Sequence, residues 1–544
     1  MLRKATVLDA THPWIHTLSG VSRLARGSLF IGTVVFLIGM SIGLVFPPPV
    51  SAKDSIQESV VRVLVTRRLP DWQRPWMKSG PQEVSGSGVV IDGKRILTNA
   101  HLVTYASSVY IQPHKSADKI TARVHAVAPG VDLALLEVDD DSFFETHPPL
   151  SLNVALPKVK DTVNVYGYPV GGIEQSITEG IISRIEYAPV NIDVSILRIQ
   201  IDAALNPGNS GGPAVIDDKM VGLVFQTLNL ASGKSSKRAE NIGYLISVEE
   251  IRMFLDDIGD GTYDGKPLIQ GVHFQLCENN ALRDWMGLED DAVGMLVSRV
   301  QSNSPDYPLK PLDLITHIGP YPIDSEGHIR VHDDLRLPAV YKVPDLLDKG
   351  TVALTVFRNG RSEKRHIPVD NRSRRLIRYE LSKYPSYFIY GPMVFTPVTN
   401  NLLGTMPRYF RSPLIAGSSI SGRSADLMAF EGEELVVLAP PMFPHKIIKG
   451  YSTKLAFGVV SHVNDVKIRN LRHLVETIRV ATDEYIAIRF ANSGNGVRFG
   501  NTENAAVVFR RQELESVTQD ILEDNGIRYQ VSKDLRDLWR SPPD

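Results

Sequence analysis

The stretch Asp202–Pro213 reads DAALNPGNSGGP and holds one serine, Ser210, among glycines. Glycine adopts backbone conformations that a side chain would obstruct, so a turn over Gly208–Gly212 can aim several main-chain N–H groups into one small space. We expect the N–H groups of Gly208 and Ser210 to stabilise the oxyanion of a tetrahedral intermediate, which is worth ~10²–10³ in rate for each donor. The stretch therefore predicts an oxyanion hole beside a serine hydroxyl.

Two further stretches carry the side chains that such a serine needs. Leu97–His101 reads LTNAH, and Val131–Leu135 reads VDLAL. Acyl transfer to water requires a hydroxyl made nucleophilic, an imidazole that accepts its proton, and a carboxylate that holds the imidazole in the right tautomer. The three residue types can be far apart in sequence because the fold brings them together.

The sequence around these stretches is rich in short β-branched runs separated by turn residues, which is typical of a sandwich or barrel. Helices are expected at 54–61 and 248–257, and a Gly/Asp-rich linker is expected at 257–267. The runs that we interpret as strands are Gly88–Ile91, Ser108–Gln112, Thr162–Tyr166, Ile196–Ile201 and Met220–Phe225.

Beyond the linker the pattern changes to α+β. The first such region is expected to contain strands at 294–300, 312–318 and 351–358 and a helix at 340–347. A similar order returns in the last part of the chain, which we interpret as a diverged duplicate. Its expected strands are 388–397, 456–464 and 485–490, and its expected helices are 470–480 and 514–523.

In these motifs the chain resembles the HtrA/Deg family of serine proteases, which have the chymotrypsin fold. TNAH, DLAL and GNSGGP carry the resemblance, and VYGYPVG (Val165–Gly171) and YPSYFIYGPMV (Tyr384–Val394) are most similar to the Deg proteases of plant organelles and their bacterial relatives with two PDZ domains. The resemblance implies a mainly β chain: a double β-barrel protease domain followed by two α+β PDZ-like domains. The implied bounds are 53–260 for the protease domain, 265–370 for the first PDZ domain, and 376–544 for the second PDZ-like domain with the C-terminal tail.

The resemblance also assigns roles to site residues. His101 would be the general base, Asp132 its orienting partner and Ser210 the nucleophile, with Gly208 and Ser210 as the oxyanion hole. Loops around 169–179 and 205–209 would shift between inactive and active arrangements. The substrate-binding residues implied by the family are Val224, Phe225, Gln226, Tyr244 and Leu245. This set contains no acid, so small or medium aliphatic P1 residues are favoured.

Composition narrows the remaining function classes. The chain has 544 residues and a net charge of −2, so no global electrostatic case exists for nucleic-acid binding. A single cysteine, Cys277, excludes an intramolecular disulfide framework, iron–sulfur ligation and a cysteine-based zinc site. The chain has no Walker-type phosphate loop, in keeping with ATP-independent action. We therefore expect no cofactor and no metal.

The N-terminal part, residues 1–52, contains an uncharged apolar stretch at 28–46. As a helix it would be about 28 Å long, near the ~30 Å hydrocarbon thickness of a bilayer. Arg23 and Arg26 precede it, so the positive-inside rule keeps the N-terminus cytoplasmic and exports the rest. A cleaved signal peptide and an uncleaved anchor both fit, and the length favours the anchor. Either one predicts a periplasm-facing, membrane-anchored or secreted protein.

Together these features predict a serine endopeptidase that degrades unfolded or damaged proteins. Family resemblance implies a homo-oligomer, a trimer or a multiple of trimers. The alternative is a PDZ scaffold or chaperone with a vestigial protease domain. We also interpret Ser87 as a turn residue, and we expect Trp72 and Trp76 either to cap a barrel or to pack in a trimer interface.

Overall fold

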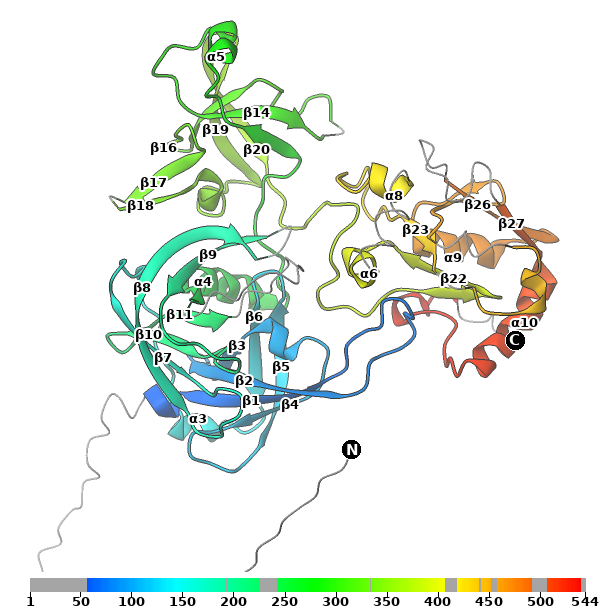
Figure 1. The fold of residues 1–544 in the computed structure, drawn as a ribbon, viewed down its shortest axis with the longest axis horizontal. Helices are drawn as coiled ribbons and strands as arrows, with labels where there is room; N and C mark the ends of the chain where they lie inside the picture. Colours follow the sequence, from blue (N-terminus) through cyan, green and yellow to red (C-terminus); the bar gives the residue numbers. More distant parts are fainter. Residues whose placement is uncertain are drawn as a thin grey trace, which may run out of the picture. The chain divides into compact units, whose positions relative to one another are not determined.

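The computed structural model of the chain is shown in Figure 1. It describes residues 56–190, 194–225, 242–302, 304–332, 334–406, 418–439, 442–451, 457–491 and 506–539. The apolar stretch 28–46 expected to enter a membrane lies outside these ranges. Within them, no helix has the length and apolar character needed to cross a bilayer.

The first part of the chain is a closed six-stranded barrel in the order β1-β2-β3-β6-β5-β4. Valines alternate along β1, and Val61, Val63 and Val65 point into the barrel core. The strands are β1 (Val60–Arg67), β2 (Gln82–Ile91), β3 (Arg95–Thr98), β4 (Ala106–Gln112), β5 (Ile120–Ala128) and β6 (Leu133–Val138), with short helices α2 (Ala100–Val103) and α3 (Phe143–Thr146). The helix expected at 54–61 is wrong at its end, because Val60 and Val61 open β1.

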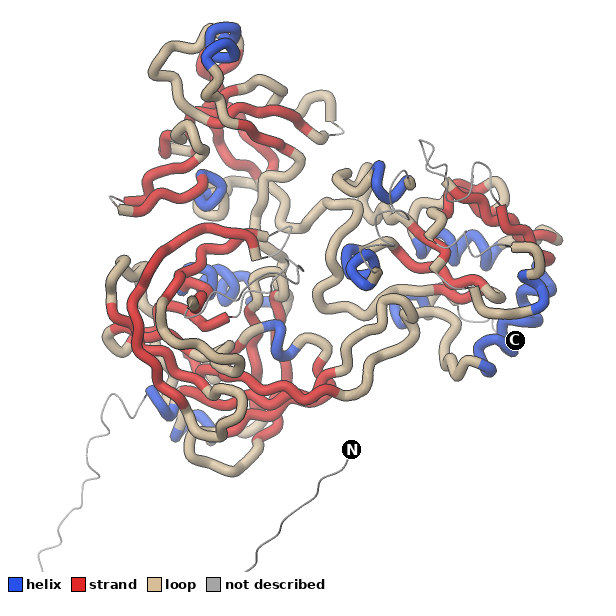
Figure 2. The backbone as a smooth tube through the Cα atoms, in the orientation of Figure 1, coloured by secondary structure: helices blue, strands red, loops and turns tan. Residues whose placement is uncertain are grey.

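A second closed barrel follows, in the order β10-β11-β12-β9-β8-β7. Its elements are β7 (Thr162–Gly167), β8 (Ser176–Pro189), β9 (Ser195–Ile201), β10 (Pro213–Ile216), β11 (Lys219–Phe225), β12 (Gly243–Ser247), helix α4 (Val248–Asp257) and the 3₁₀ turn η1 (Ile258–Asp260). Helix α4 has the predicted bounds, and its first turn is capped by the Ser247 hydroxyl. Strands dominate both barrels in Figure 2, as predicted.

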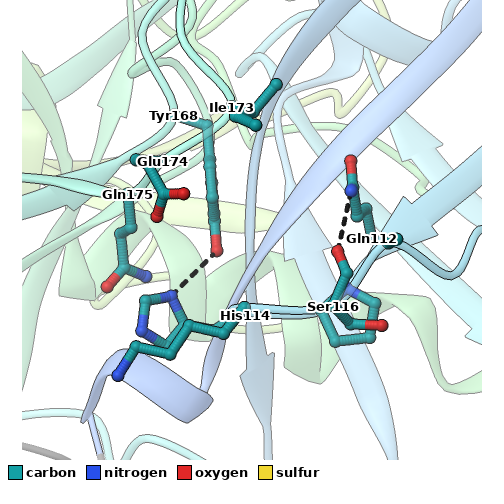
Figure 3. Close-up of a pocket in the computed structure, with 10 residues that line it drawn as sticks. Gln112, His114, Ser116, Tyr168, Ile173, Glu174 and Gln175 are labelled. Carbon is teal, nitrogen blue, oxygen red and sulfur yellow. Dashed lines mark hydrogen bonds between the residues drawn. The ribbon is translucent and has the colours of Figure 1, made fainter. Parts of the chain in front are cut away.

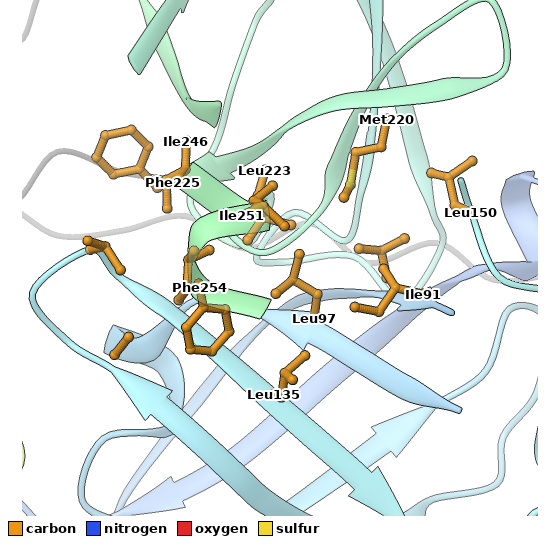
Figure 4. Close-up of a cluster of buried hydrophobic side chains, with 14 of the residues drawn as sticks. Ile91, Leu97, Leu135, Leu150, Met220, Leu223, Phe225, Ile246, Ile251 and Phe254 are labelled. Carbon is orange, nitrogen blue, oxygen red and sulfur yellow. The ribbon is translucent and has the colours of Figure 1, made fainter. Parts of the chain in front are cut away.

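One buried cluster joins the two barrels. Figure 4 shows Ile91, Leu97 and Leu135 of the first barrel meeting Leu223 and Ile246 of the second. Helix α4 adds Ile251 and Phe254 to the same cluster. The candidate base follows β3, the candidate carboxylate precedes β6, and the serine turn precedes β10 and β11. The shared core therefore holds the elements next to the base and carboxylate against those next to the serine.

The next region forms a sheet in the order β13-β14-β15-β19-β20, with β16 beside β15 and a separate β17-β18 hairpin. Its elements are β13 (Val272–Gln275), α5 (Asn280–Met286), β14 (Met295–Val300), β15 (Leu314–Ile318), β16 (Tyr321–Pro322), β17 (His328–His332), β18 (Leu335–Pro338), η2 (Ala339–Lys342), β19 (Thr351–Arg358) and β20 (Arg361–Pro368). The three predicted strands are present. The α-helix expected at 340–347 is wrong: only the 3₁₀ turn η2 forms, and Pro344 follows it closely.

The last region has two sheets, β21-β22-β23 and β25-β24-β26-β27. Its elements are β21 (Phe388–Tyr390), β22 (Met393–Pro397), α6 (Asn400–Thr405), α8 (Ser419–Gly422), β23 (Val436–Leu438), η3 (Lys446–Ile448), β24 (Val460–Val463), β25 (Val466–Lys467), α9 (Leu471–Val480), β26 (Tyr485–Phe490), β27 (Ala506–Arg510), α10 (Arg511–Asp524) and η5 (Lys533–Leu535). The single strand expected at 388–397 is a hairpin instead, because Gly391 takes a left-handed conformation with φ +56°.

Candidate active site

The predicted base and carboxylate are in direct contact. His101 lies on α2, directly after β3, and Asp132 lies directly before β6. The imidazole Nδ1 is 2.8 Å from Asp132 Oδ2 and 3.0 Å from Oδ1. Asp132 is only 4% exposed, so this charge interaction is little weakened by water. The predicted pairing of these two residues is therefore present in the fold.

Main-chain hydrogen bonds fix the orientation of the pair. The His101 N–H donates to Asp132 Oδ1 at 2.9 Å, and the Asn99 side-chain amide donates to the Asp132 carbonyl at 3.0 Å. Arg67, at the end of β1, donates to the His101 carbonyl at 3.0 Å. A carboxylate only accepts hydrogen bonds, so Nδ1 carries the proton and Nε2 is left as the acceptor. This is the tautomer that a general base for a hydroxyl requires.

Opposing effects act on the pKa of His101. Burial lowers it, the charge and hydrogen bond of Asp132 raise it, and the nearby Arg67 charge lowers it. The net result is a pKa above the ordinary value of 6.5. The imidazolium that forms when His101 takes a proton is thus stabilised by the adjacent carboxylate.

The serine turn lies between β9 and β10. Gly208 and Gly211 have φ of +103° and +85°, conformations that favour glycine. The Gly211 N–H donates to the Val224 carbonyl at 2.9 Å, and the Ser87 N–H donates to the Ser210 carbonyl at 2.8 Å. Ser210 is 6% exposed. The turn is therefore fastened to both barrels.

Two observations relate this turn to the rest of the candidate site. A Cβ on Gly86 would lie 2.4 Å from Leu102 Cδ1 and 3.1 Å from the Ser210 carbonyl, so Gly86 of β2 lies against both the serine turn and α2. The N–H groups of Gly208 and Ser210 donate to no acceptor within the described residues. No hydrogen bond joins the Ser210 hydroxyl to the His101 ring in this arrangement of the described residues.

The predicted substrate-binding residues lie on the paired strands β11 and β12. Val224 pairs with Leu245, and both side chains are buried in the core of the second barrel. Phe225 pairs with Tyr244, their rings lie 6.4 Å apart, and Phe225 joins the core between the barrels. Gln226 lies outside the described residues. The half-buried side chain of Tyr244 can therefore contact a substrate, whereas the side chains of Val224, Phe225 and Leu245 lie in the core and cannot.

A cavity of about 310 Å³ lies between residues 112–117, at and after the end of β4, and residues 168–175, before β8 (Figure 3). It is lined by His114, Tyr168, Ile173, Glu174 and six other residues, and none of the predicted catalytic residues is among them. In the described ranges, no group of three or more His, Cys, Asp or Glu side chains could hold a metal ion.

Sequence reasoning missed the role of several residues near the site. Ser87 is not in a turn: it lies within β2, is fully buried and hydrogen-bonds to the serine turn. Its glycine-flanked setting was the only available signal. Trp76 does not cap a barrel, because its ring lies 5.3 Å from Phe443 and 6.4 Å from Tyr387 of the last region, and Trp72 packs into a neighbouring cluster of that region.

Comparison with known proteins gives two domain matches and several similar proteases. A family model described as a trypsin-like peptidase domain matches residues 86–223, and a PDZ domain model matches residues 377–534. "Protease Do-like 4, mitochondrial" of Arabidopsis thaliana is 33% identical over 444 residues, covering 81% of this chain and 80% of that protein. "Protease Do-like 2, chloroplastic" of the same plant is 31% identical over 497 residues, covering 90% and 77%.

Among solved structures, the HtrA-type protease AlgW with a tripeptide is 21% identical, with a TM-score of 0.45, and the match covers 59% of this chain and 97% of that one.

Proposed function

Because the chain belongs to the HtrA/Deg family of serine proteases, which includes the Do-like proteases, we propose that Ser210, His101 and Asp132 form its catalytic triad. The protein is a serine endopeptidase of protein quality control. The observation that carries the triad assignment is the contact between the buried Asp132 and the partly exposed His101, whose tautomer leaves Nε2 ready to accept a proton.

The proposed triad gives each group a role in the reaction. His101 Nε2 accepts the Ser210 hydroxyl proton as the oxygen attacks the scissile carbonyl, and the Asp132 carboxylate stabilises the resulting imidazolium. The N–H groups of Gly208 and Ser210 stabilise the oxyanion of the tetrahedral intermediate. His101 then gives the proton to the leaving amine, and water repeats the cycle on the acyl-enzyme. A hydrogen bond between the Ser210 hydroxyl and His101 Nε2 must form before this proton transfer.

The substrate that we propose is an unfolded or damaged protein. Only an extended strand presents its backbone to such a cleft, which a folded domain cannot do without opening. A small or medium aliphatic P1 residue is favoured, because the residues proposed to surround the P1 side chain include no acid. The scaffold alternative is not favoured, since every residue type of the triad is present and the base and carboxylate are paired.

The test uses the full chain and its Ser210→Ala variant. A fluorophosphonate probe should label Ser210 of the wild type, as located by peptide mapping, and casein should be cleaved only by the wild type. Equal residual cleavage by both proteins, or labelling at another residue, would refute the assignment.

We also propose that the folded part works outside the cytoplasm, with residues 28–46 as a membrane anchor or signal segment, and as a trimer or a multiple of trimers. The support is the charge-free apolar stretch and the family resemblance. A mass measurement of the mature protein decides the first point: an N-terminus at Lys53 would show cleavage and remove the anchor. Native mass spectrometry decides the second.

A further inference from the structure

We infer that Ser87 is a positioning residue that holds the oxyanion hole in its working shape, an inference that presupposes the proposed function. Ser87 lies in β2 of the first barrel and is fully buried. Its hydroxyl donates to the Gly208 carbonyl at 2.8 Å and accepts from the Tyr168 N–H at 2.8 Å. One side chain of the first barrel therefore connects two backbone segments of the second.

These two bonds bear on the orientation of the Gly208 N–H. That N–H belongs to the peptide unit joining Pro207 to Gly208, and the carbonyl of this unit accepts from the Val170 N–H at 2.7 Å. In a trans peptide the carbonyl and the next N–H point in opposite directions, so holding the carbonyl toward Val170 turns the Gly208 N–H away from it. The Ser87 hydroxyl holds the peptide unit on the other side of Gly208.

Ser87 also acts on the segment that supplies Val170. Its hydroxyl anchors the N–H of Tyr168, two residues earlier, and a Cβ on Gly208 would lie 2.4 Å from the Tyr168 carbonyl. The segment and the turn therefore pack in close contact. Both peptide units next to Gly208 depend on Ser87, one directly and one through Tyr168–Val170.

The main chain of Ser87 is engaged with the same turn. Its N–H donates to the Ser210 carbonyl, and its carbonyl accepts from the Thr98 hydroxyl at 2.7 Å. A Cβ on Gly211 would lie 2.0 Å from the Ser87 carbonyl, so the turn lies directly against β2. Only a short side chain that both donates and accepts a hydrogen bond can make the two hydroxyl contacts, and serine meets both conditions.

Loss of the hydroxyl leaves the buried Tyr168 N–H and Gly208 carbonyl without this partner, which frees the peptide units to turn. The ground-state substrate does not need the oxyanion hole, whereas the transition state does. We therefore expect Ser87→Ala to lower kcat about 10–100-fold, with KM within about twofold of the wild type.

The experiment compares full-length wild type, Ser87→Ala, and Ser59→Ala as a matched control. Ser59 is also a buried serine, directly before β1, and its hydroxyl donates to the Pro148 carbonyl at 2.6 Å, which is not part of the serine turn. The substrate is a fluorogenic peptide copied from a casein site that the wild type cleaves. A peptide aldehyde of the same sequence reports on the oxyanion hole, because its adduct carries the oxyanion.

Ser87→Ala should lower kcat and weaken aldehyde binding by the same factor. In a Ser210→Ala background, Ser87→Ala should leave binding of the uncleaved peptide unchanged. Ser59→Ala should keep kcat and aldehyde binding even if its melting temperature falls. If Ser87→Ala does not fold, Ser87→Cys replaces it, since a thiol keeps the approximate volume but is a weak hydrogen-bonding group.

The inference is overturned if the wild type is active and the Ser87 variant has a kcat within threefold of the wild-type value. It is also overturned if the variant loses kcat but keeps its affinity for the aldehyde. A wild type that shows no Ser210-dependent turnover overturns the proposed function, and this inference with it. The two failures are thus distinguishable.

Discussion

Replacing Asp132 by asparagine tests the tautomer on which the proposed mechanism depends. The His101 main-chain N–H donates to Asp132 Oδ1 at 2.9 Å, so the asparagine oxygen is favoured at that position. The amide NH₂ then takes the place of Oδ2, which lies 2.8 Å from Nδ1 of the ring. An NH₂ group only donates, so Nδ1 must accept and Nε2 must carry the proton. His101 can then no longer accept a proton from Ser210.

The size of the effect has two sources. Flipping the amide to restore the working tautomer leaves a buried main-chain N–H facing an NH₂ group, at about 1–3 kcal/mol. Loss of the carboxylate also removes the charge that stabilises the imidazolium in the transition state. Together these should lower kcat about 10⁴-fold, the loss typical of this substitution in a Ser-His-Asp triad. That factor corresponds to about 5.5 kcal/mol.

The same substitution should move the pH profile. Asp132 supplies the charge and the hydrogen bond that raise the pKa of His101, whereas burial and Arg67 lower it. Without the carboxylate only the lowering effects remain, so the pKa of His101 should fall and the acidic limb of kcat/KM should move to lower pH. The assay is peptide hydrolysis from about pH 5 to 9.

Asp139→Asn is the matched control, because this carboxylate is 71% exposed and pairs with Arg123 on the surface of the same barrel. It should leave rate and profile unchanged. An Asp132→Asn variant that loses less than tenfold in kcat, or whose acidic limb moves to higher pH, would refute the reasoning.

Three further outcomes follow from the same structure. In the wild type, kcat/KM should fall as the pH drops through a midpoint above 6.5, because His101 must be neutral to act as a base and its pKa is raised; a midpoint below 6.5 contradicts this. Lys266→Met should lower the free energy of unfolding in urea by about 3–5 kcal/mol, since it leaves the Glu250 carboxylate, whose side chain is 2% exposed, without its ion-pair partner. The double variant Lys266→Met with Glu250→Leu should recover most of this loss. An effect of Lys266→Met alone under about 1 kcal/mol would count against the argument. Gly208→Ala should lower kcat at least ~100-fold, because its Cβ would lie 2.4 Å from a main-chain carbonyl, whereas Gly80→Ala, whose Cβ would meet nothing within 4 Å, should be neutral; equal rates would contradict it.

Local signals predicted much of the fold. Strands β19 and β26 and helix α4 have the predicted bounds. In α4 the apolar residues Val248, Ile251 and Phe254 recur at helical spacing directly after a serine cap. These elements carry their pattern within a few residues, so no knowledge of their packing partners was needed.

Where tertiary contacts or single residues decide, the predictions were wrong. The stretch 388–397 reads as one strand by composition, yet Gly391 and Pro392 fold it into the hairpin of β21 and β22. The run 54–61 has helical character, but Val60 and Val61 are taken into the first barrel, where pairing with β2 overrides the local preference.

The candidate site shows the same difference between what local sequence predicts and what tertiary contacts decide. The types and roles of His101, Asp132 and Ser210 could be inferred from short motifs, because the chemistry demands those groups. Ser87 could not, because its hydroxyl partners lie 81 and 121 residues away in the chain. A short sequence window shows that Ser87 lies between two glycines. It does not show which distant segments of the chain pack against those glycines.

The division of the site between two barrels has a mechanical consequence. The base and carboxylate belong to the first barrel and the nucleophile to the second, so their alignment depends on how the barrels are joined. Contacts of two kinds join them at this point. One is the apolar cluster that includes Leu97 and Leu223, and the other is the set of hydrogen bonds that Ser87 makes with the Ser210 carbonyl, the Gly208 carbonyl and the Tyr168 N–H. The apolar cluster is non-directional and sets only the distance between the barrels. The hydrogen bonds are directional and set the orientation of individual peptide units. Ser87 therefore provides directional contacts next to the serine turn, beside the hydrophobic packing. This is why one buried hydroxyl is expected to influence kcat more than its contribution to stability would suggest.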